Sequence, residues 1–392
     1  MKVDKSKWDV MTFSQVGKSQ LGKTLDSNKN SGKPYPYLCA YNVGYGTFNL
    51  STVKTILLED EELEKYLVKK GDLLICEGGD TGRCAIWEDD MPIYYQNALH
   101  RVRLNDNVNN RFIMRYMHYL KRIGIIDKLS HGQTIKHFTQ KGLNRLVFKL
   151  PSIEEQEVIS TELDALQKVI DGYREQIADL DALAQSIFLD TFGDPITNPK
   201  GWEIKSLKDL VSKMSTGPFG SMLHKEDYCN EGIPTINPQD IKNNQISVES
   251  IAKVNFEKAS ELRKYTLNEN DIVIARRGDL SKCAVIRNEH KGWLCGTGSF
   301  FLTLQNYNPT LFFYCYTSES IQKYLNDKCI GSTMPNLNQG ILTSLKFPVP
   351  PLELQQQFAT QVEAIEKQKD LLRQQLADAE MLMAERMQYY FS

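Results

Sequence analysis

A phosphate-loop pattern is the sharpest local motif of the sequence, and it would imply nucleotide chemistry. Residues 17–24 read Gly-Lys-Ser-Gln-Leu-Gly-Lys-Thr. Such a loop cradles phosphates only when a buried strand precedes it and a helix follows it. The residues before this loop form a poor buried strand, and the polar residues after it run into a proline and cannot continue a helix. Nucleotide binding is therefore a minor alternative, and we interpret Lys18, Lys23 and Thr24 as contacts to a nucleic-acid backbone.

The second group of candidate residues consists of polar, basic and aromatic side chains in loops. Arginine pairs with guanine, and asparagine or glutamine with adenine, through two hydrogen bonds in the DNA major groove. A solvated loop side chain is the simpler interpretation of each residue alone, but the clusters favour DNA contact. In the first 150 residues they are Tyr41, Asn42, Tyr45, Gln96, Asn97, His100, Arg101, Arg103, His131, Gln133, Lys136 and His137; later in the chain they are Asn237, Gln239, Arg276, Arg277, Lys282, Thr297, Ser299, Ser332, Asn336, Asn338 and Gln339.

Residues that could perform catalysis or hold a metal do not form a recognisable pattern. The sequence has neither the short Asn- or Asp-Pro-Pro-aromatic loop of an amino-methyltransferase nor the spacing of a catalytic triad or zinc site. Its eight cysteines include no Cys-x-x-Cys pair, which is typical of reduced cytosolic thiols. We therefore expect no catalytic residue, no metal site and no cofactor on this chain.

Two long helices with heptad seams must position these loops. Apolar residues alternate spacings of four and three from Ile159 to Ile187, after a start at Pro151 that suits a helix N-terminus. A second seam follows 199 residues later, although Lys369 and Arg386 occupy two of its core phases. We predict that the helices pair through Ile159, Leu163, Leu166, Ile170, Tyr173 and Ile177 of the first and Phe358, Val362, Ile365, Leu372 and Leu376 of the second.

The offset of 199 residues extends over the whole chain and indicates an internal duplication. Residues 270–275 repeat the apolar pattern of residues 71–76, and each long helix is preceded by a lobe of mixed strand and helix signals. From these signals we expect two copies of a mixed α/β lobe, each followed by a long helix with a coiled-coil seam. The predicted boundaries are 1–150 for the first lobe, 151–192 for its helix, 193–349 for the second lobe and 350–392 for its helix.

Charge is segregated between the helices and the lobes. Residues 151–192 carry ten acids and two bases, and residues 350–392 carry seven acids and four bases. The helices together therefore carry −11, and because the whole chain carries −2, the remainder carries +9. Basic lobes suit a polyanionic partner. The N-terminus resembles no signal peptide and no apolar run could span a membrane, so the expected location is the cytoplasm.

The combination of these features resembles the specificity subunit of type I restriction-modification systems. Residues 146–156, which end Lys-Leu-Pro-Ser-Ile-Glu-Glu-Gln, and residues 345–355, which end Pro-Val-Pro-Pro-Leu-Glu-Leu-Gln, each close a lobe and open a long helix. The resemblance implies the fold class, which is two mixed α/β target-recognition domains separated by two long antiparallel coiled-coil helices. It implies that each of these lobes reads one half of a split site in double-stranded DNA. It also implies that the helices set the spacer and dock two DNA adenine methyltransferase subunits, with restriction subunits as further partners. S-adenosylmethionine, ATP and magnesium would then be bound by partner subunits.

The main alternative is a two-lobed coiled-coil scaffold that binds proteins, for which the basic lobes would be incidental. DNA binding through phosphate contacts weakens steeply as salt rises, whereas a protein scaffold need not show this dependence. A salt titration therefore separates the two hypotheses.

Overall fold

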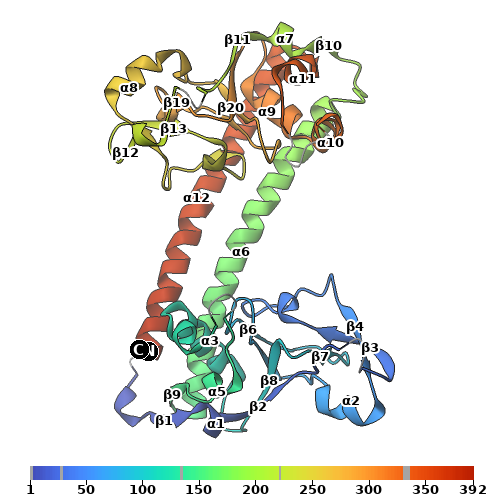
Figure 1. Cartoon of the computed structure of the whole chain (residues 1–392), viewed down its shortest axis with the longest axis vertical. Coiled ribbons are helices and arrows are strands. Elements are labelled where there is room, and N and C mark those ends of the chain that lie inside the picture. Colours follow the sequence, from blue (N-terminus) through green and yellow to red (C-terminus); the bar gives the residue numbers. More distant parts are fainter. Residues whose placement is uncertain (1–2, 27–29, 133–135, 220–221, 330–335) are drawn as a thin grey trace. The chain divides into compact units, whose positions relative to one another are not determined.

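The protein is described by a computed structural model over residues 3–26, 30–132, 136–219, 222–329 and 336–392. The chain divides into two compact units, which we treat separately. Unit 1 comprises Met1–Arg174 and Gln374–Ser392, and unit 2 comprises Glu175–Arg373. Each unit contains one module of strands and short helices together with part of both long helices (Figure 1). Among the helices described, none combines the length and the apolarity that crossing a bilayer requires.

The first module, residues 3–150, is built on three small sheets. The four-stranded sheet has the order β2-β8-β5-β6, the three-stranded sheet has the order β4-β3-β7, and β1 pairs with β9. The elements are η1 (Lys5–Lys7), β1 (Asp9–Thr12), α1 (Phe13–Val16), β2 (Gly17–Leu21), β3 (Lys33–Leu38), η2 (Ala40–Asn42), β4 (Lys54–Leu58), α2 (Asp60–Tyr66), β5 (Leu73–Cys76), β6 (Cys84–Ile86), β7 (Tyr94–Tyr95), β8 (Leu99–Leu104), α3 (Asn110–Arg122), α4 (Ile125–Leu129), α5 (Gln140–Leu143) and β9 (Val147–Leu150).

Strand β5 is an inner strand of the four-stranded sheet, and apolar side chains cover both of its faces. Leu73 and Ile75 belong to the core that includes Phe112 of α3, whereas Leu74 and Cys76 belong to the core of the three-stranded sheet. All four β5 side chains are fully buried. A continuous apolar run is what a strand covered on both faces requires.

The second module, residues 193–349, repeats this plan. Its four-stranded sheets have the orders β11-β20-β17-β18 and β12-β16-β13-β19, β10 pairs with β21, and β14 with β15 forms a hairpin. The elements are β10 (Glu203–Ser206), α7 (Leu207–Leu210), β11 (Val211–Thr216), η3 (Lys225–Asp227), β12 (Tyr228–Cys229), β13 (Ile233–Ile236), η4 (Pro238–Asp240), β14 (Ile241–Lys242), β15 (Gln245–Ile246), β16 (Lys253–Val254), α8 (Phe256–Glu261), η5 (Arg263–Tyr265), β17 (Ile272–Ala275), β18 (Cys283–Val285), η6 (Asn288–His290), β19 (Leu294–Cys295), β20 (Ser299–Leu304), α9 (Pro309–Thr317), α10 (Glu319–Lys328), α11 (Gln339–Ser344) and β21 (Lys346–Val349).

The two modules share one topology. The sheet β2-β8-β5-β6 corresponds to β11-β20-β17-β18, and each smaller sheet contains one parallel pair, β3 with β7 and β13 with β19. The pair β1 with β9 likewise corresponds to β10 with β21. The predicted fold class, two mixed α/β copies with two long helices, is therefore confirmed.

A left-handed residue before the central strand is the clearest local sign of the repeat. Gly71 has φ of 89° and Asn270 has φ of 70°, and both belong to the residue types that tolerate this region. The carboxylate that follows each one, Asp72 or Asp271, accepts a hydrogen bond at 2.8 Å from the backbone N–H three residues upstream. The matching Gly-Asp and Asn-Asp pairs of the sequence are thus turns that start the central strands.

The segment with the phosphate-loop pattern corrects one sequence-based alternative. Residues 17–21 are strand β2, which pairs along its length with β8, and Lys18 lies opposite Arg103. A continuous strand directs its amides into the sheet and offers no cradle for phosphates. Strands β7 and β8 are separated by a turn at residues 96–98, in which the Asn97 N–H donates to Lys23 O (3.0 Å).

The long helices are α6 (Ile153–Phe192) and α12 (Leu352–Phe391). Within unit 1, the predicted residues Ile159, Leu163 and Ile170 of α6 share a core with Met383 and Met387 of α12. Within unit 2, Phe358 of α12 packs on α6, with its ring centroid 5.2 Å from that of Phe192. In each unit the two helix segments therefore pack together through their apolar seams.

The remaining predicted seam residues are less uniform. Leu166, Tyr173 and Leu376 are partly buried against the core of unit 1, and Val362 lies in the core of unit 2. Ile365 and Leu372 are also buried, whereas Ile177 is half-buried.

The two cations at core phases of the second seam are satisfied by acids. Arg386 and Tyr390 both bond to Glu162, within unit 1. In unit 2, Lys369 is 4% exposed and its Nζ lies 2.5 Å from both Asp181 and Glu366. A buried charge is retained only when it is paired in this way. These cations therefore belong to the pairing of the helices.

Each module is joined to the start of its own long helix by a buried glutamine. Gln156 Oε1 accepts from the Asn109 N–H (2.9 Å), and Gln355 Oε1 accepts from the Asn308 N–H (2.8 Å). Each side-chain amide also donates to the proline carbonyl five residues upstream, at 3.0 Å and 2.7 Å respectively. Both glutamines are 1% exposed. The identical glutamines of the repeat thus fix a loop of the module to its helix.

Replacing this glutamine should destabilise unit 2. We expect Gln355→Ala to lower the free energy of unfolding by about 1–3 kcal/mol, because it leaves a buried N–H and a buried carbonyl without partners. The exposed Gln357, two residues along α12, supplies the control, and Gln357→Ala should change stability by less than about 0.5 kcal/mol. Urea denaturation followed by circular dichroism measures both. Equal midpoints for the two variants would contradict the role given to Gln355.

Candidate nucleic-acid interface

The clearest cluster of predicted residues lies at one edge of the large sheet of the second module. We call residues 276–282, 296–298 and 336–338 the second loop edge. The Arg276 N–H donates to Gly298 O and the Leu337 N–H donates to Arg276 O, both at 2.8 Å. The backbone of Arg277 forms an isolated antiparallel β-bridge with the backbone of Asn336. Backbone hydrogen bonds thus bring three separate segments together, and the predicted residues Arg276, Arg277, Lys282, Thr297, Asn336 and Asn338 all lie on them.

The cations of the second loop edge are not neutralised locally. Arg277 is exposed, and within the described part of the chain neither Arg276 nor Arg277 has an ion-pair partner. The guanidinium of Arg276 lies 5.9 Å from the ring centroid of Phe300. Arginines held without a carboxylate are suited to phosphate oxygens or guanine edges.

The uncharged polar residues predicted near this edge differ in their exposure to solvent. Asn338 is exposed but caps α11, since its Oδ1 accepts from the Ile341 N–H (2.8 Å). Asn336 and Thr297 are exposed, as is Gln339 on the first turn of α11. Ser299 is fully buried in β20, so we leave it out of the proposed interface. Ser332 lies outside the described residues.

The first module has an equivalent edge of different charge. We call residues 77–82, 96–98 and 136–138 the first loop edge. The Glu77 N–H donates to Ala98 O (2.8 Å), and the Phe138 N–H donates to Glu77 O (2.7 Å), which repeats the bonds of Arg276. Burial raises the pKa of the Glu77 carboxyl. An acid thus occupies the position that an arginine holds in the second module.

The predicted contacts of the first module that remain accessible lie on this edge or elsewhere on the surface of the module. Lys136, His131 and His137 are exposed, and the two histidines pair through backbone bonds of 3.0 Å and 2.8 Å. Gln96 and Asn97 are half-buried on the turn before β8. Gln133 lies outside the described residues. Lys18 and Thr24 are exposed at β2 and just beyond it, and Tyr41 and Tyr45 are exposed on the loop after β3.

Several predicted contacts instead hold the first module together. Arg101 is 6% exposed and donates to Leu67 O (2.6 Å) and to Gln20 Oε1 (2.7 Å). His100 is fully buried beside the Phe138 carbonyl, with its Nε2 3.0 Å from that oxygen. Because these groups bond to other parts of the fold, we leave them out of the proposed interface.

Three further predicted residues have structural partners as well. Lys23 forms an ion pair with Glu62, and Arg103 forms one with Asp72. Asn42 is 1% exposed and bonds to the backbone on both sides of its turn. Charge and amide content alone made these side chains resemble DNA contacts. Only their burial and their partners, which depend on the fold, separate them from the accessible residues.

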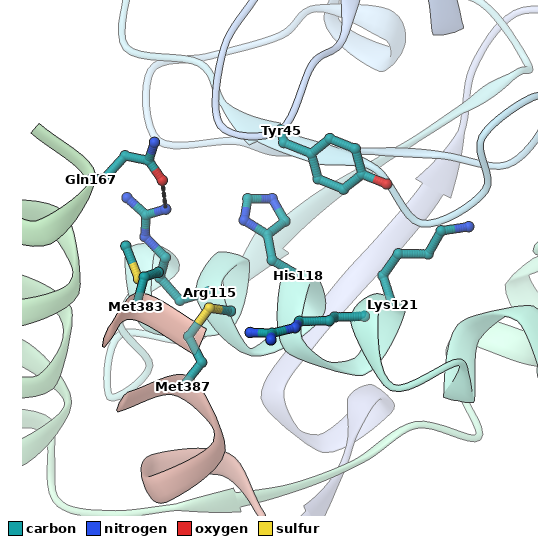
Figure 2. Close-up of a pocket in the computed structure, with 8 residues that line it drawn as sticks. Tyr45, Arg115, His118, Lys121, Gln167, Met383 and Met387 are labelled. Carbon is teal, nitrogen blue, oxygen red and sulfur yellow. Dashed lines mark hydrogen bonds between the residues drawn. The ribbon is translucent and has the colours of Figure 1, made fainter. Parts of the chain in front are cut away.

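A cavity of about 310 Å³ in unit 1 was not anticipated from the sequence (Figure 2). It is lined by Tyr45, Arg115, His118, Lys121, Arg122, Gln167, Met383 and Met387. Arg115 is bound by Asp164 and Gln167, and Lys121 by Asp80 and Asp127. The lining comes from four regions far apart in sequence, so no local spacing could reveal it. Within the described residues there is no cluster of His, Cys, Asp and Glu that could hold a metal.

His118 of this cavity should make unit 1 sensitive to acid. Burial lowers the pKa of His118 from 6.5 to about 4, and its Nε2 lies 3.1 Å from Cys84 O. As the pH falls below about 6.5, the imidazole of His118 is protonated in the unfolded chain but stays neutral in the folded chain until about pH 4. The free energy of unfolding should therefore fall as the pH drops from about 6.5 to about 4. At about 1.4 kcal/mol per pKa unit, the loss is on the order of 3 kcal/mol.

Hydrogen exchange of the α3 amides measures this loss of stability. A His118→Gln variant should lose less protection than the parent over the same pH range, while a variant of the exposed His131, His131→Gln, should follow the parent. Identical profiles for His118→Gln and the parent would refute the assignment.

Comparisons with known proteins agree with this geometry. A family model described as the type I restriction modification DNA specificity domain matches residues 5–180 and 199–381. The type I restriction enzyme MjaVIII specificity subunit of Methanocaldococcus jannaschii is 20% identical over 360 residues, which cover 87% of this chain and 81% of that protein. The EcoBI specificity subunit of Escherichia coli is 21% identical over 343 residues, covering 81% and 71%. A solved S subunit of the type I restriction-modification system of M. genitalium has a TM-score of 0.59 at 17% identity, covers 100% of this chain and 98% of its own, and shows the shared fold.

Proposed function

Because the chain belongs to the type I restriction modification DNA specificity family, we propose that it directs a methylating complex to a DNA site in two halves, one half read by each module. The single observation that carries this proposal is the pair of loop edges. One scaffold presents Glu77 at a position where the other presents Arg276. Two similar scaffolds with different side chains can read two different sequences.

The long helices have two roles in this proposal. As continuous helices of 40 residues each, α6 and α12 are suited to set the spacer between the half-sites. They also carry exposed apolar side chains, such as Leu183 and its repeat mate Leu382, which suit docking of two methylating subunits. The relatives named above are specificity subunits of type I restriction enzymes, which supports partners of this kind.

The chain itself contributes recognition and no chemistry in this proposal. The thiol of Cys84, for example, is fully buried and its pKa is raised by burial, which suits a packed and unreactive side chain. S-adenosylmethionine, ATP and magnesium would be bound by the methylating and restriction subunits. The complex would act on DNA in the cytoplasm.

Mapping modified bases in the host genome tests the proposal. A strain with the intact gene should carry methyl groups at one sequence of two short halves separated by a fixed gap, and a strain without the gene should lose them. Unchanged methylation in the two strains would contradict the proposed function. For the protein-scaffold alternative, the purified complex should show no preference among DNA sequences at any salt concentration.

A further inference from the structure

Two short turns, one in each module, are built in the same way around a single free side chain. Turn η2 (Ala40–Asn42) follows β3, and turn η4 (Pro238–Asp240) follows β13, the strand equivalent to β3. The last residue of each turn donates its N–H to the carbonyl three residues upstream, at 2.9 Å in both modules. The turns therefore occupy the same place in the shared topology.

The first shared restraint is a buried side chain that closes each turn. Asn42 Oδ1 accepts from the Cys39 N–H (2.9 Å), and Asp240 Oδ2 accepts from the Asn237 N–H (2.8 Å). Asn42 is 1% exposed and Asp240 is 5% exposed. Buried side chains that accept a backbone hydrogen bond in this way fix the backbone of a turn.

The second shared restraint comes from a cation on another segment. Arg83 Nη2 donates to Ala40 O (2.5 Å), and Lys282 Nζ donates to Pro238 O (3.0 Å). Arg83 and Lys282 are repeat mates at the offset of 199 residues, and each directly precedes the strand β6 or β18. The same interaction is thus made by different basic residues.

A third restraint ties each turn to the segment that follows it. The Asn49 N–H donates to Asn42 O, and the Ser247 N–H donates to Asp240 O, both at 2.8 Å. Three independent bonds therefore hold each turn rigidly. A rigid backbone lowers the entropy that a side chain on it must lose on binding.

The middle residue of each turn is the one that these restraints leave free. Tyr41 is 68% exposed, and Gln239 is exposed. Neither side chain has a hydrogen-bond partner in the part of the chain that the structure describes. The surrounding bonds are repeated while the middle residue differs, which is the pattern expected of a position that reads different bases in the two half-sites.

Each turn also lies against its loop edge. A Cβ built on Gly298 of the second loop edge would be 3.6 Å from Pro238 Cγ, and Lys282 belongs to that edge. In the first module, Cys76 Sγ lies 3.8 Å from Ala40 O, directly before the first loop edge. The middle residue of each turn is therefore placed beside the other candidate DNA contacts of its module.

We propose that Tyr41 and Gln239 are equivalent specificity-determining residues, each reading one base position in the half-site of its module. This inference rests on the proposed function. The Gln239 amide can donate to and accept from an adenine in the major groove, and the Tyr41 ring can contact a thymine methyl group. The two residues are 198 positions apart, so the ungapped offset of 199 does not align them.

Modified-base sequencing with Gln239 variants of the full chain tests this inference. In cells that express the partner subunits, Gln239→Ala should make one position of the second half-site degenerate, with a roughly 5- to 150-fold loss of preference there. Gln239→Glu should move the preference at that position toward cytosine, because a carboxylate can accept a hydrogen bond from the cytosine amino group. The first half-site should stay unchanged in both variants.

The controls separate this inference from the proposed function. Gln357→Ala on α12 should leave both half-sites as in the parent. If both Gln239 variants methylate the parental second half-site with undiminished preference, the inference is overturned and the proposed function stands. The inference is likewise overturned if preference is lost at several positions together, because that indicates a disturbed module. A parent chain that directs methylation to no two-part sequence contradicts the proposed function and this inference with it.

Discussion

Removing seven residues from each long helix should shorten the recognised gap by up to about three base pairs while both half-sites stay unchanged. Seven residues span about 10.5 Å of helix, and DNA rises about 3.4 Å per base pair. A deletion of 171–177 with 373–379 removes one heptad from each seam, so the apolar phase of the helices is retained. Sites with the parental gap should lose their methylation, and sites with the shortened gap should gain it.

Deletions of four residues serve as the matched comparison. Removing four residues from each helix at the same place breaks the heptad phase between the two ends of each seam, so methylation should fall at every gap length. Modified-base sequencing reads both results. If the heptad deletion leaves the parental gap in place, the helices do not set the spacer.

Replacing both arginines of the second loop edge should weaken DNA binding by the complex roughly ten- to hundredfold. Neither Arg276 nor Arg277 has an acidic partner among the described residues, so each is available to a phosphate or a guanine. If both contact phosphates, the slope of log affinity against log salt should fall in magnitude by about 2. A contact to guanine would instead relax one base position of the second half-site.

The control for this pair uses two exposed lysines elsewhere in the second module. Lys208 lies on α7 and Lys346 on β21. Lys208→Ala with Lys346→Ala removes the same charge but should leave the affinity within about twofold of the parent. Titrations of the purified complex with its DNA site at several salt concentrations measure both pairs. Equal losses for the two pairs would mean that net charge, and not the loop edge, governs binding.

The fold was predictable because its signals are local and repeated. A seam such as that from Ile159 to Ile187 is typical of a long helix that packs along one face. The offset of 199 residues indicates the duplication directly. The strand topology of the modules could not be predicted in the same way, because short strands such as β7 (Tyr94–Tyr95) have too few residues to show an alternating pattern.

The candidate site was predictable only in part. Arg276 and Arg101 look alike in sequence, yet Arg276 has no ion-pair partner among the residues that the structure describes, whereas Arg101 is 6% exposed and donates to Leu67 O. That difference depends on Gln20 and on backbone carbonyls far along the chain, which no spacing reveals. The equivalence of Tyr41 and Gln239 was hidden for a different reason, since insertions and deletions in the loops shift the register by one residue.

Exchange of one module is the most direct test of the claim that each module reads one half-site. Residues 1–150 would be replaced by the corresponding module of another specificity subunit, with both long helices kept, and modified bases would be sequenced in the host. We predict a hybrid site with one new half, the other half retained and the same gap. A site in which both halves change, or in which neither does, would contradict the account.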